Sequence, residues 1–356
     1  MDSSFLVYIQ TEFNNVKNYP MATIKDVARI AGVSVASVSR VLNNGPKVSK
    51  NTIEKVSQVM KDLNYSPNAN ARALVTQKST TVGVVIPDLI DPFFASLANG
   101  VEQVARQKNM QLLLSTCLVT AESEMQAINL LIERRCDVMV VHSKKLSDDA
   151  LIELASNVSG LVLIDRYIEE ISERCVWLDN LEGGKIAARH LLALNHQNFA
   201  CISSKHQIDD PLLRLQGFQH ELQTAGADIE PSLIEYGEPT LQGGEVATQK
   251  LLASGNRFSA LFVYNDAMAI GAISTLEDNG FKVPSDISVL GFDDVLLSRY
   301  SRPKLSTLNY PIEEMAMQAA NIALELSAKN SVVNKDKNYK HIPRLVKRES
   351  TSFKPS

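Results

Sequence analysis

The sequence predicts a small all-α N-terminal domain followed by a larger α/β body of two doubly wound parallel-sheet lobes. Apolar residues recur at helical spacing between residues 23 and 66, whereas the remaining chain alternates β-branched runs with amphipathic helical segments. Charge is also divided unequally. Residues 21–80 contain nine Lys and Arg against three Asp and Glu, a formal charge of +6, and residues 81–356 carry −9. A basic head on an acidic body indicates that only the head meets a phosphate-rich partner.

Composition excludes several classes of protein. The sequence has no run of about 18 apolar residues, so we expect no membrane span. Its four cysteines lie far apart without zinc-type spacing, which predicts reduced thiols in a cytoplasmic protein and no metal site. Residues 1–20 lack the features of a secretory signal, and patterned sequence begins abruptly at Met21. We therefore expect residues 1–20 to be a disordered extension or a misassigned start.

Residues 21–66 are predicted to form three short helices. Thr23 and Asp26 resemble a capping box, Gly32 follows the first helix, and Ser34 and Ser49 are N-cap candidates for the next two. The positions expected to face inward are Ile24, Val27, Ala28, Ala31, Val38, Val41, Leu42, Ile53, Val56, Val59, Met60 and Leu63. Two helices joined by a short turn containing glycine are typical of a helix-turn-helix.

The outward face of the second helix predicts double-stranded DNA as a partner. Small side chains near a helix start allow close approach to base edges, so Val35 and Ala36 suit thymine methyls, and Arg40 suits a forked contact to guanine. The hydroxyls expected on phosphates are those of Ser34, Ser37 and Ser39. The alternative is a three-helix bundle that binds protein or nothing, but the basic charge and the turn favour DNA.

Residues 67–80 form an Ala-rich stretch too short for a stable isolated helix. They are either a plain linker or a helix that forms only on DNA and inserts Leu74 into the minor groove. The residues alone leave both interpretations open.

The body shows strand–helix alternation over some 230 residues, which predicts two doubly wound sheets. The expected strands are 81–87, 111–115, 137–142, 160–165, 199–203, 232–236, 260–264 and 287–292. The expected helices are 93–108, 121–133, 148–156, 183–194, 211–225, 242–253 and 267–278.

Polar residues follow five of these strands, and ligands of such sheets bind beyond the carboxyl ends of the strands. Carboxylates, an amide and a guanidinium suit a polyhydroxylated ring, because each sugar hydroxyl both donates and accepts hydrogen bonds. The polar candidates are Asp88, Asp91, Asp165, Arg166, Arg214, Asn265, Asp266, Asp293 and Asp294, with Phe93, Phe94 and Tyr310 for the flat face of the ring.

The sequence contains no GxSxG, P-loop, HExxH or GxGxxG motif, and its histidines have no evident nucleophile partner. We therefore expect no catalytic residues and no cofactor. An enzyme of sugar metabolism is the rival disfavoured by this absence. A stand-alone sugar-binding protein would share the acidic body but would lack the basic helix-turn-helix.

From Met21 onward the chain resembles the lactose/galactose repressor family of bacterial transcription regulators. The segments that carry the resemblance are TIKDVARIAGVSVASVSRVLN, YSPNANARAL, VGVVIPDLIDPFF, RLQGF, VYNDAMAIGA, VPSDISVLGFDD and LVKRES. The chain most resembles galactose-type members of the family, in the segments ERRCDVMVVHSK, YGEPTLQGGE, LEDNG and FDDVLLSRYSRPKLSTLNYPI.

The resemblance implies a homodimer on a pseudo-palindromic operator, with Leu74 of a hinge helix intercalated at its centre. It adds Thr23, Asn43, Asn68 and Ala71 to the DNA contacts. It also implies two lobes like those of periplasmic sugar-binding proteins, about 81–178 with 311–328, and about 179–310 with 329–356.

The resemblance further implies an effector sugar, galactose or a related hexose, that releases the operator; another sugar or a purine stays open. The implied effector contacts are Asp91, Phe93, Asp165, Arg214, Asn265, Asp293 and Tyr310. Asp165 stands where galactose-type members often have asparagine. The polar C-terminal stretch lacks leucine heptads, which favours a dimer over a tetramer.

Overall fold

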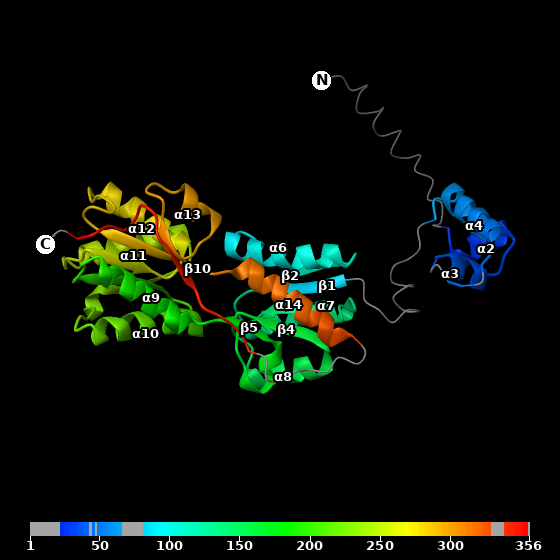
Figure 1. The fold of residues 1–356 in the computed structure, drawn as a ribbon, viewed down its shortest axis with the longest axis horizontal. Coiled ribbons are helices and arrows are strands. Elements are labelled where there is room, and N and C mark those ends of the chain that lie inside the picture. Colours follow the sequence, from blue (N-terminus) through cyan, green and yellow to red (C-terminus); the bar gives the residue numbers. More distant parts are fainter. Residues whose placement is uncertain (1–21, 43–44, 47, 66–80, 329–337, 355–356) are drawn as a thin grey trace, which may run out of the picture. The chain divides into compact units, whose positions relative to one another are not determined.

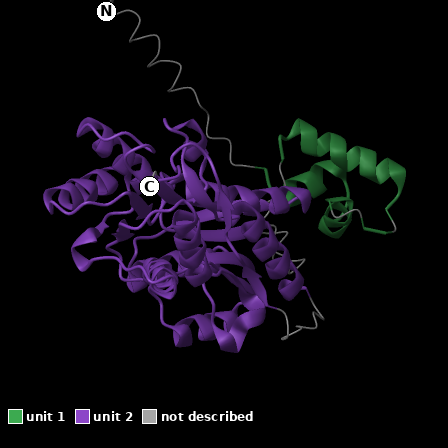
Figure 2. Cartoon of the chain, turned by 60° about the vertical axis from the view of Figure 1, so that its left-hand side comes forward, with its two compact units in different colours: residues 1–78 green, residues 79–356 purple. Residues whose placement is uncertain are grey.

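The computed structural model describes residues 22–42, 45–46, 48–65, 81–328 and 338–354. The chain separates into two compact units, residues 1–78 and residues 79–356 (Figure 2). Several predictions lie outside the described residues: the extension 1–20, the hinge 67–80, and the contacts of Asn43, Asn68, Ala71 and Leu74.

The first unit contains the three predicted helices, α2 (Ile24–Ala31), α3 (Val35–Leu42) and α4 (Lys50–Asp62). Thr23 and Asp26 form the capping box at the start of α2, and Gly32 ends that helix with a left-handed φ of 63°. The core of the unit consists of Val27, Ala28, Ala31, Val38 and Val56.

The prediction is wrong for one core residue of this unit. Ile53 is 43% exposed, although Val56 on the next turn of α4 is fully buried. The eight-residue helices α2 and α3 are each about 12 Å long, whereas the 13-residue α4 is about 20 Å long. The shorter helices therefore cannot cover the whole of α4, and Ile53 in its first turn is one of the positions that are exposed.

The first sheet of the large unit has the strand order β11-β5-β4-β3-β1-β2, and all its strands run parallel. Its continuous elements are β1 (Thr81–Ile86), α6 (Pro92–Gln107), β2 (Gln111–Thr116), α7 (Ala121–Glu133), β3 (Val138–His142), α8 (Asp148–Asn157), β4 (Gly160–Ile164), η1 (Glu169–Arg174) and β5 (Cys175–Leu178).

The second sheet has the order β12-β10-β9-β8-β6-β7, and only β12 runs antiparallel to its neighbour. Its elements are α9 (Asn180–Ala193), β6 (Phe199–Ser204), α10 (Asp209–Thr224), η2 (Pro231–Leu233), β7 (Ile234–Gly237), α11 (Leu241–Ala253), β8 (Ala260–Val263), α12 (Asp266–Asp278), β9 (Ser288–Asp293), α13 (Leu296–Tyr300) and β10 (Ser306–Asn309). The predicted architecture of two doubly wound lobes is confirmed.

The chain crosses between the two lobes three times (Figure 1). The first crossing follows β5, and the second leads from β10 into α14 (Ile312–Ser327), which packs beside α6 on the first lobe. The third joins β11 (Tyr339–His341) in the first sheet to β12 (Arg344–Val346) in the second. The predicted boundary therefore needs a correction, because β11 belongs to the first lobe and not to the second.

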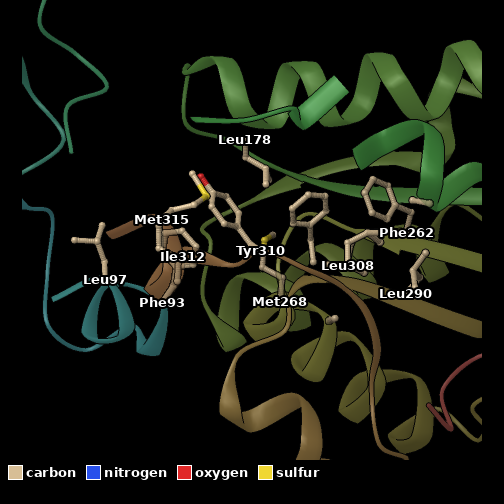
Figure 3. Close-up of a cluster of buried hydrophobic side chains, with 14 of the residues drawn as sticks. Phe93, Leu97, Leu178, Phe262, Met268, Leu290, Leu308, Tyr310, Ile312 and Met315 are labelled. Carbon is tan, nitrogen blue, oxygen red and sulfur yellow. The ribbon is translucent and has the colours of Figure 1, made fainter. Parts of the chain in front are cut away.

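The hydrophobic core is continuous from one lobe to the other. Tyr310, on the second crossing, lies between Phe93 and Met315 of the first lobe and Met268 and Leu308 of the second (Figure 3). Its ring meets that of Phe93 edge-to-face, with the centroids 4.9 Å apart. The second crossing is thus packed on both sides rather than exposed as a free linker. Within the described ranges, no helix is both long enough and apolar enough to cross a membrane.

Helices α9 and α10 of the second lobe meet backbone to backbone. A Cβ atom on Gly184 would lie 2.0 Å from the carbonyl oxygen of Arg214, and one on Gly217 would lie 2.0 Å from that of Leu181. Only glycine permits this approach, so the contact fixes the helix that carries Arg214.

The second lobe also contains a buried histidine whose titration affects stability. His190 on α9 lies 3.1 Å from Thr351 through its Nε2 and the threonine Oγ1. Burial, together with Lys347, lowers the pKa of His190 from 6.5 to about 4. A base with a lowered pKa in the folded chain favours folding above pH 6.5, and this contribution is lost as the pH falls towards 4.

We expect His190→Gln to make the protein less sensitive to acid. Between pH 7 and pH 4.5 the wild type should lose about 2–3 kcal/mol more unfolding free energy than the variant, because only the wild type takes up this proton on unfolding. Urea unfolding at the two pH values measures the difference, with the exposed His220→Gln as the control. Equal losses in wild type and His190→Gln would contradict the assignment.

Candidate ligand pocket and nucleic-acid interface

A cavity of about 480 Å³ lies between the two lobes, beyond the carboxyl ends of the strands. The first lobe contributes the segments that follow β1, β3 and β4, and the second contributes the starts of α10, α11 and α12 and the end of β9. The site is therefore built in the place that the topology predicts for a ligand. Six predicted effector residues line it: Asp91, Phe93, Asp165, Arg214, Asn265 and Asp293.

Tyr310, the seventh predicted contact, does not line the cavity. Its hydroxyl donates a hydrogen bond to Oδ1 of Asp165, and its ring packs behind Phe93. The expected contact with the ligand therefore needs a correction: in this structure Tyr310 supports two lining residues from behind.

Arg214 forms the centre of the wall contributed by the second lobe. Its Nε donates to Oδ1 of Asn180 at 2.8 Å, and one terminal nitrogen donates to the carbonyl oxygen of Tyr264 at 2.7 Å. Its guanidinium also stacks 3.6 Å above the ring of Phe292 and lies 3.5 Å from Oδ1 of Asp293. These contacts hold a buried cation in one orientation in the wall of the cavity.

Asp165 is the most heavily bonded carboxylate of the first lobe. Oδ1 accepts from Tyr310, while Oδ2 lies 2.7 Å from Nζ of Lys144 and 3.3 Å from Nε2 of His142. Burial opposes ionisation, but Lys144 and His142 hold the pKa of Asp165 below its ordinary value. Its backbone has a φ of 60°, a left-handed conformation that a non-glycine residue adopts at a cost.

Asp91 and Asp293 face the same cavity from opposite lobes. Asp91 caps α6 by accepting the backbone N–H of Phe93 at 2.9 Å, and burial raises its pKa. Burial raises the pKa of Asp293 well above its ordinary value, although the charge of Arg214 opposes this. Asn265 caps α12 through Met268 and donates to the carbonyl oxygen of Pro239. Each polar side chain is thus held by the fold before any ligand arrives.

Sequence reasoning missed three charged residues of the pocket, Glu124, Lys144 and Asp210. Lys144 Nζ lies 2.7 Å from Oδ1 of Asp210, in the first turn of α10. The signal was present: Lys144 follows the strand 138–142 just as Asp165 follows the next strand of the sheet. What the sequence lacks is any sign that Asp210, from the other lobe, would lie opposite.

The lining carries more carboxyl groups than permanent cations. Six carboxylates, those of Asp88, Asp91, Glu124, Asp165, Asp210 and Asp293, surround two permanent cations, Lys144 and Arg214. Such a wall disfavours a phosphorylated ligand and suits a neutral one with many hydroxyls. Across the described ranges, no group of three or more His, Cys, Asp or Glu residues could hold a metal ion.

The first unit presents the predicted recognition face on α3. Val38 points into the core, whereas Ser34, Val35, Ala36 and Arg40 are exposed, and Ser37 and Ser39 are half-buried. Because Ala36 and Arg40 are four residues apart, they share one face of the helix. The Ser34 hydroxyl also caps α3 by accepting the backbone N–H of Ser37 at 3.1 Å, and Thr23 caps α2.

The comparisons with known proteins match a segment of each unit. Residues 23–68 match the profile of bacterial regulatory proteins of the lacI family, and residues 188–351 match a periplasmic binding protein-like domain. The HTH-type transcriptional regulator GalR of Escherichia coli is 46% identical over 332 residues, which cover 93% of this chain and 96% of the relative. This chain belongs to the lacI family. It is a DNA-binding transcription regulator.

Another lacI-family relative is the HTH-type transcriptional regulator GalS of Salmonella typhimurium, 43% identical over 94% of this chain and 98% of the relative. The lac repressor dimer bound to operator and the anti-inducer ONPF superposes with a TM-score of 0.82 at 28% identity, covering 93% of this chain and 99% of that one. The CelR–cellobiose complex gives 0.67 at 27% identity, covering 92% and 99%.

We expect Tyr310→Phe to weaken ligand binding although Tyr310 lies outside the cavity. The variant keeps the ring on Phe93 but removes the donor to Asp165, a charge-assisted bond typically worth about 1.5–3 kcal/mol. Part of this loss should appear as a lower unfolding free energy, measured in urea. Tyr300→Phe, at a residue that is 71% exposed, is the control and should change neither quantity.

Proposed function

We propose that this chain represses genes of sugar uptake or metabolism, and that galactose or a closely related hexose releases it from its operator. The observation that carries the proposal is the set of charged and amide side chains that line the pocket between the lobes, in a chain of which 93% aligns with GalR. Neutral hydroxyl groups match its mixture of carboxylates, one amide, one guanidinium and one ammonium. We further propose that the protein is cytoplasmic and has no enzymatic activity.

The ligand would be held from both sides. Asp91 and Asp165 belong to the first lobe, whereas Arg214, Asn265 and Asp293 belong to the second. A sugar that contacts both walls stabilises one separation of the lobes over others, because only that separation allows all of its bonds.

DNA binding would use α3 of a homodimer on a pseudo-palindromic operator. Val35, Ala36 and Arg40 would contact bases, Ser34, Ser37 and Ser39 would contact phosphates, and residues 67–80 would form a hinge that inserts Leu74 into the minor groove. If lobe closure misaligns the two hinges, sugar and operator weaken each other's binding by the same factor.

A different effector would fit the same framework, since one solved relative carries cellobiose. The deciding experiment titrates galactose, fucose, ribose and adenine into the full chain. Two signals are followed: fluorescence of Trp177, the single tryptophan, and release of a DNA site selected from a random pool. We expect galactose or fucose to release the DNA. If neither galactose nor fucose changes the affinity for DNA, the proposed effector is wrong.

The variant Arg214→Met should separate ligand binding from DNA binding. It loses two hydrogen bonds and a buried cation at the pocket wall, so we expect the half-maximal galactose concentration to rise at least about tenfold. Arg134→Ala, on the exposed end of α7, is the control and should behave as wild type. Unchanged galactose release in Arg214→Met would contradict the assigned site.

In the other direction, Arg40→Ala should weaken operator binding by about 1–3 kcal/mol and relax the preference for one guanine. Competition against sites altered at single base pairs measures both effects. Galactose affinity should be retained, because Arg40 belongs to the other unit. A variant that loses both functions would contradict this separation of DNA and sugar binding.

A further inference from the structure

Lys144 makes a buried ionic contact between the lobes. Its Nζ lies 2.7 Å from Oδ2 of Asp165 in the first lobe and 2.7 Å from Oδ1 of Asp210 in the second. The Lys144 side chain is only 8% exposed, and those of Asp165 and Asp210 are equally buried. Burial alone would lower the pKa of Lys144, but the two carboxylates raise it, so the ammonium is charged.

The backbone at Lys144 is fixed to the first lobe. The carboxylate of Glu124, on α7 and 3% exposed, accepts the backbone N–H groups of Lys144, Lys145 and Leu146 at 3.0–3.1 Å. It also accepts the hydroxyl of Ser143 at 2.6 Å. Lys144 therefore cannot follow the second lobe when the lobes separate, because its backbone is bonded to the first.

On the other side, Asp210 is connected to the ligand wall. Asn180 donates through Nδ2 to Oδ1 of Asp210 at 3.4 Å and accepts from Nε of Arg214 at 2.8 Å. Helices α9 and α10, which carry these residues, are in backbone contact at Gly184 and Gly217. The position of Asp210 is thereby coupled to the position of Arg214.

We propose that Lys144 is a positioning residue whose contact with Asp210 closes the lobes without any sugar. The pair holds Arg214 and Asp293 at a distance from Asp91 and Asp165 that a single ligand can span. Opening the lobes breaks the 2.7 Å contact with Asp210 and leaves Lys144 with Asp165 as its ionic partner. Without the pair, the sugar itself must supply the free energy of closure, so its apparent affinity falls. The expected effect on sugar response rests on the proposed function, whereas the closure itself does not.

The decisive variant is Asp210→Asn, which keeps the shape and the bond to Asn180 but removes the charge opposite Lys144. Lys144→Met removes the other partner, and a double variant completes the cycle. Asp209→Asn is the matched control, because Asp209 is the exposed neighbour on the same first turn of α10.

The first measurement uses no ligand. Spin labels on Glu153→Cys and Gln216→Cys, both exposed and on opposite lobes, report the separation in the full chain. The four native cysteines are buried, and a fourfold excess of unlabelled protein restricts the signal to pairs within one chain. We expect Asp210→Asn to shift the distances towards longer values and Asp209→Asn to match the parent. Identical distributions for Asp210→Asn and Asp209→Asn would overturn the proposal.

The second measurement titrates galactose against operator release. Asp210→Asn should raise the half-maximal concentration about tenfold. Lys144→Met should raise it at least as much, because it also leaves Asp165 without its lysine partner. The double variant should rise no further than Lys144→Met, because the contact between Lys144 and Asp210 is already lost. Multiplied effects in the double variant would overturn the pairing. Thermal unfolding close to that of Asp209→Asn shows that the variants fold, and Lys144→Met replaces Asp210→Asn if the latter does not. A wild type that ignores galactose while Asp210→Asn opens would refute galactose as effector and leave the closure intact.

Discussion

The buried carboxylate of Asp165 organises much of the large unit. A desolvated charge is costly unless donors surround it, and here the donors come from three places: the end of β3, the loop after it, and the second crossing between the lobes. Satisfying this one group fixes Lys144 and Tyr310. Through Lys144 it contacts Asp210, and through Tyr310 it joins the continuous core. The ligand pocket and the second crossing between the lobes therefore depend on the same carboxylate.

The sequence was most informative where chemistry follows topology. The ends of parallel strands meet at one edge of a sheet, which is why the sequence alone groups Asp91, Asp165, Asn265 and Asp293. The same reasoning predicted the helices and strands that alternate along the body. Capping residues such as Thr23 and Ser49 were also predictable, since their bonds are local.

The misses concern contacts between segments far apart in the chain. Asp210 lies opposite Lys144 only because two separate sheets face each other, and no periodicity encodes that distance. Tyr310 was expected to contact the ligand because it is aromatic, yet it packs behind Phe93. Ile53 has a core residue's spacing, but its partners depend on the relative lengths of three helices. The predicted second lobe also included β11, because register between distant strands is set by tertiary structure.

The third crossing has a consequence for how the chain is synthesised. Each sheet receives an outer strand from the last part of the chain, β11 for the first and β12 for the second. Until residues 339–346 have left the ribosome, β5 and β10 are unpaired edges, and open edges are templates for association with other chains. Both lobes therefore have these edge strands covered late and nearly at the same time. A nascent chain that stops short of residue 339 has an unpaired edge at β5 and at β10, so neither lobe is complete.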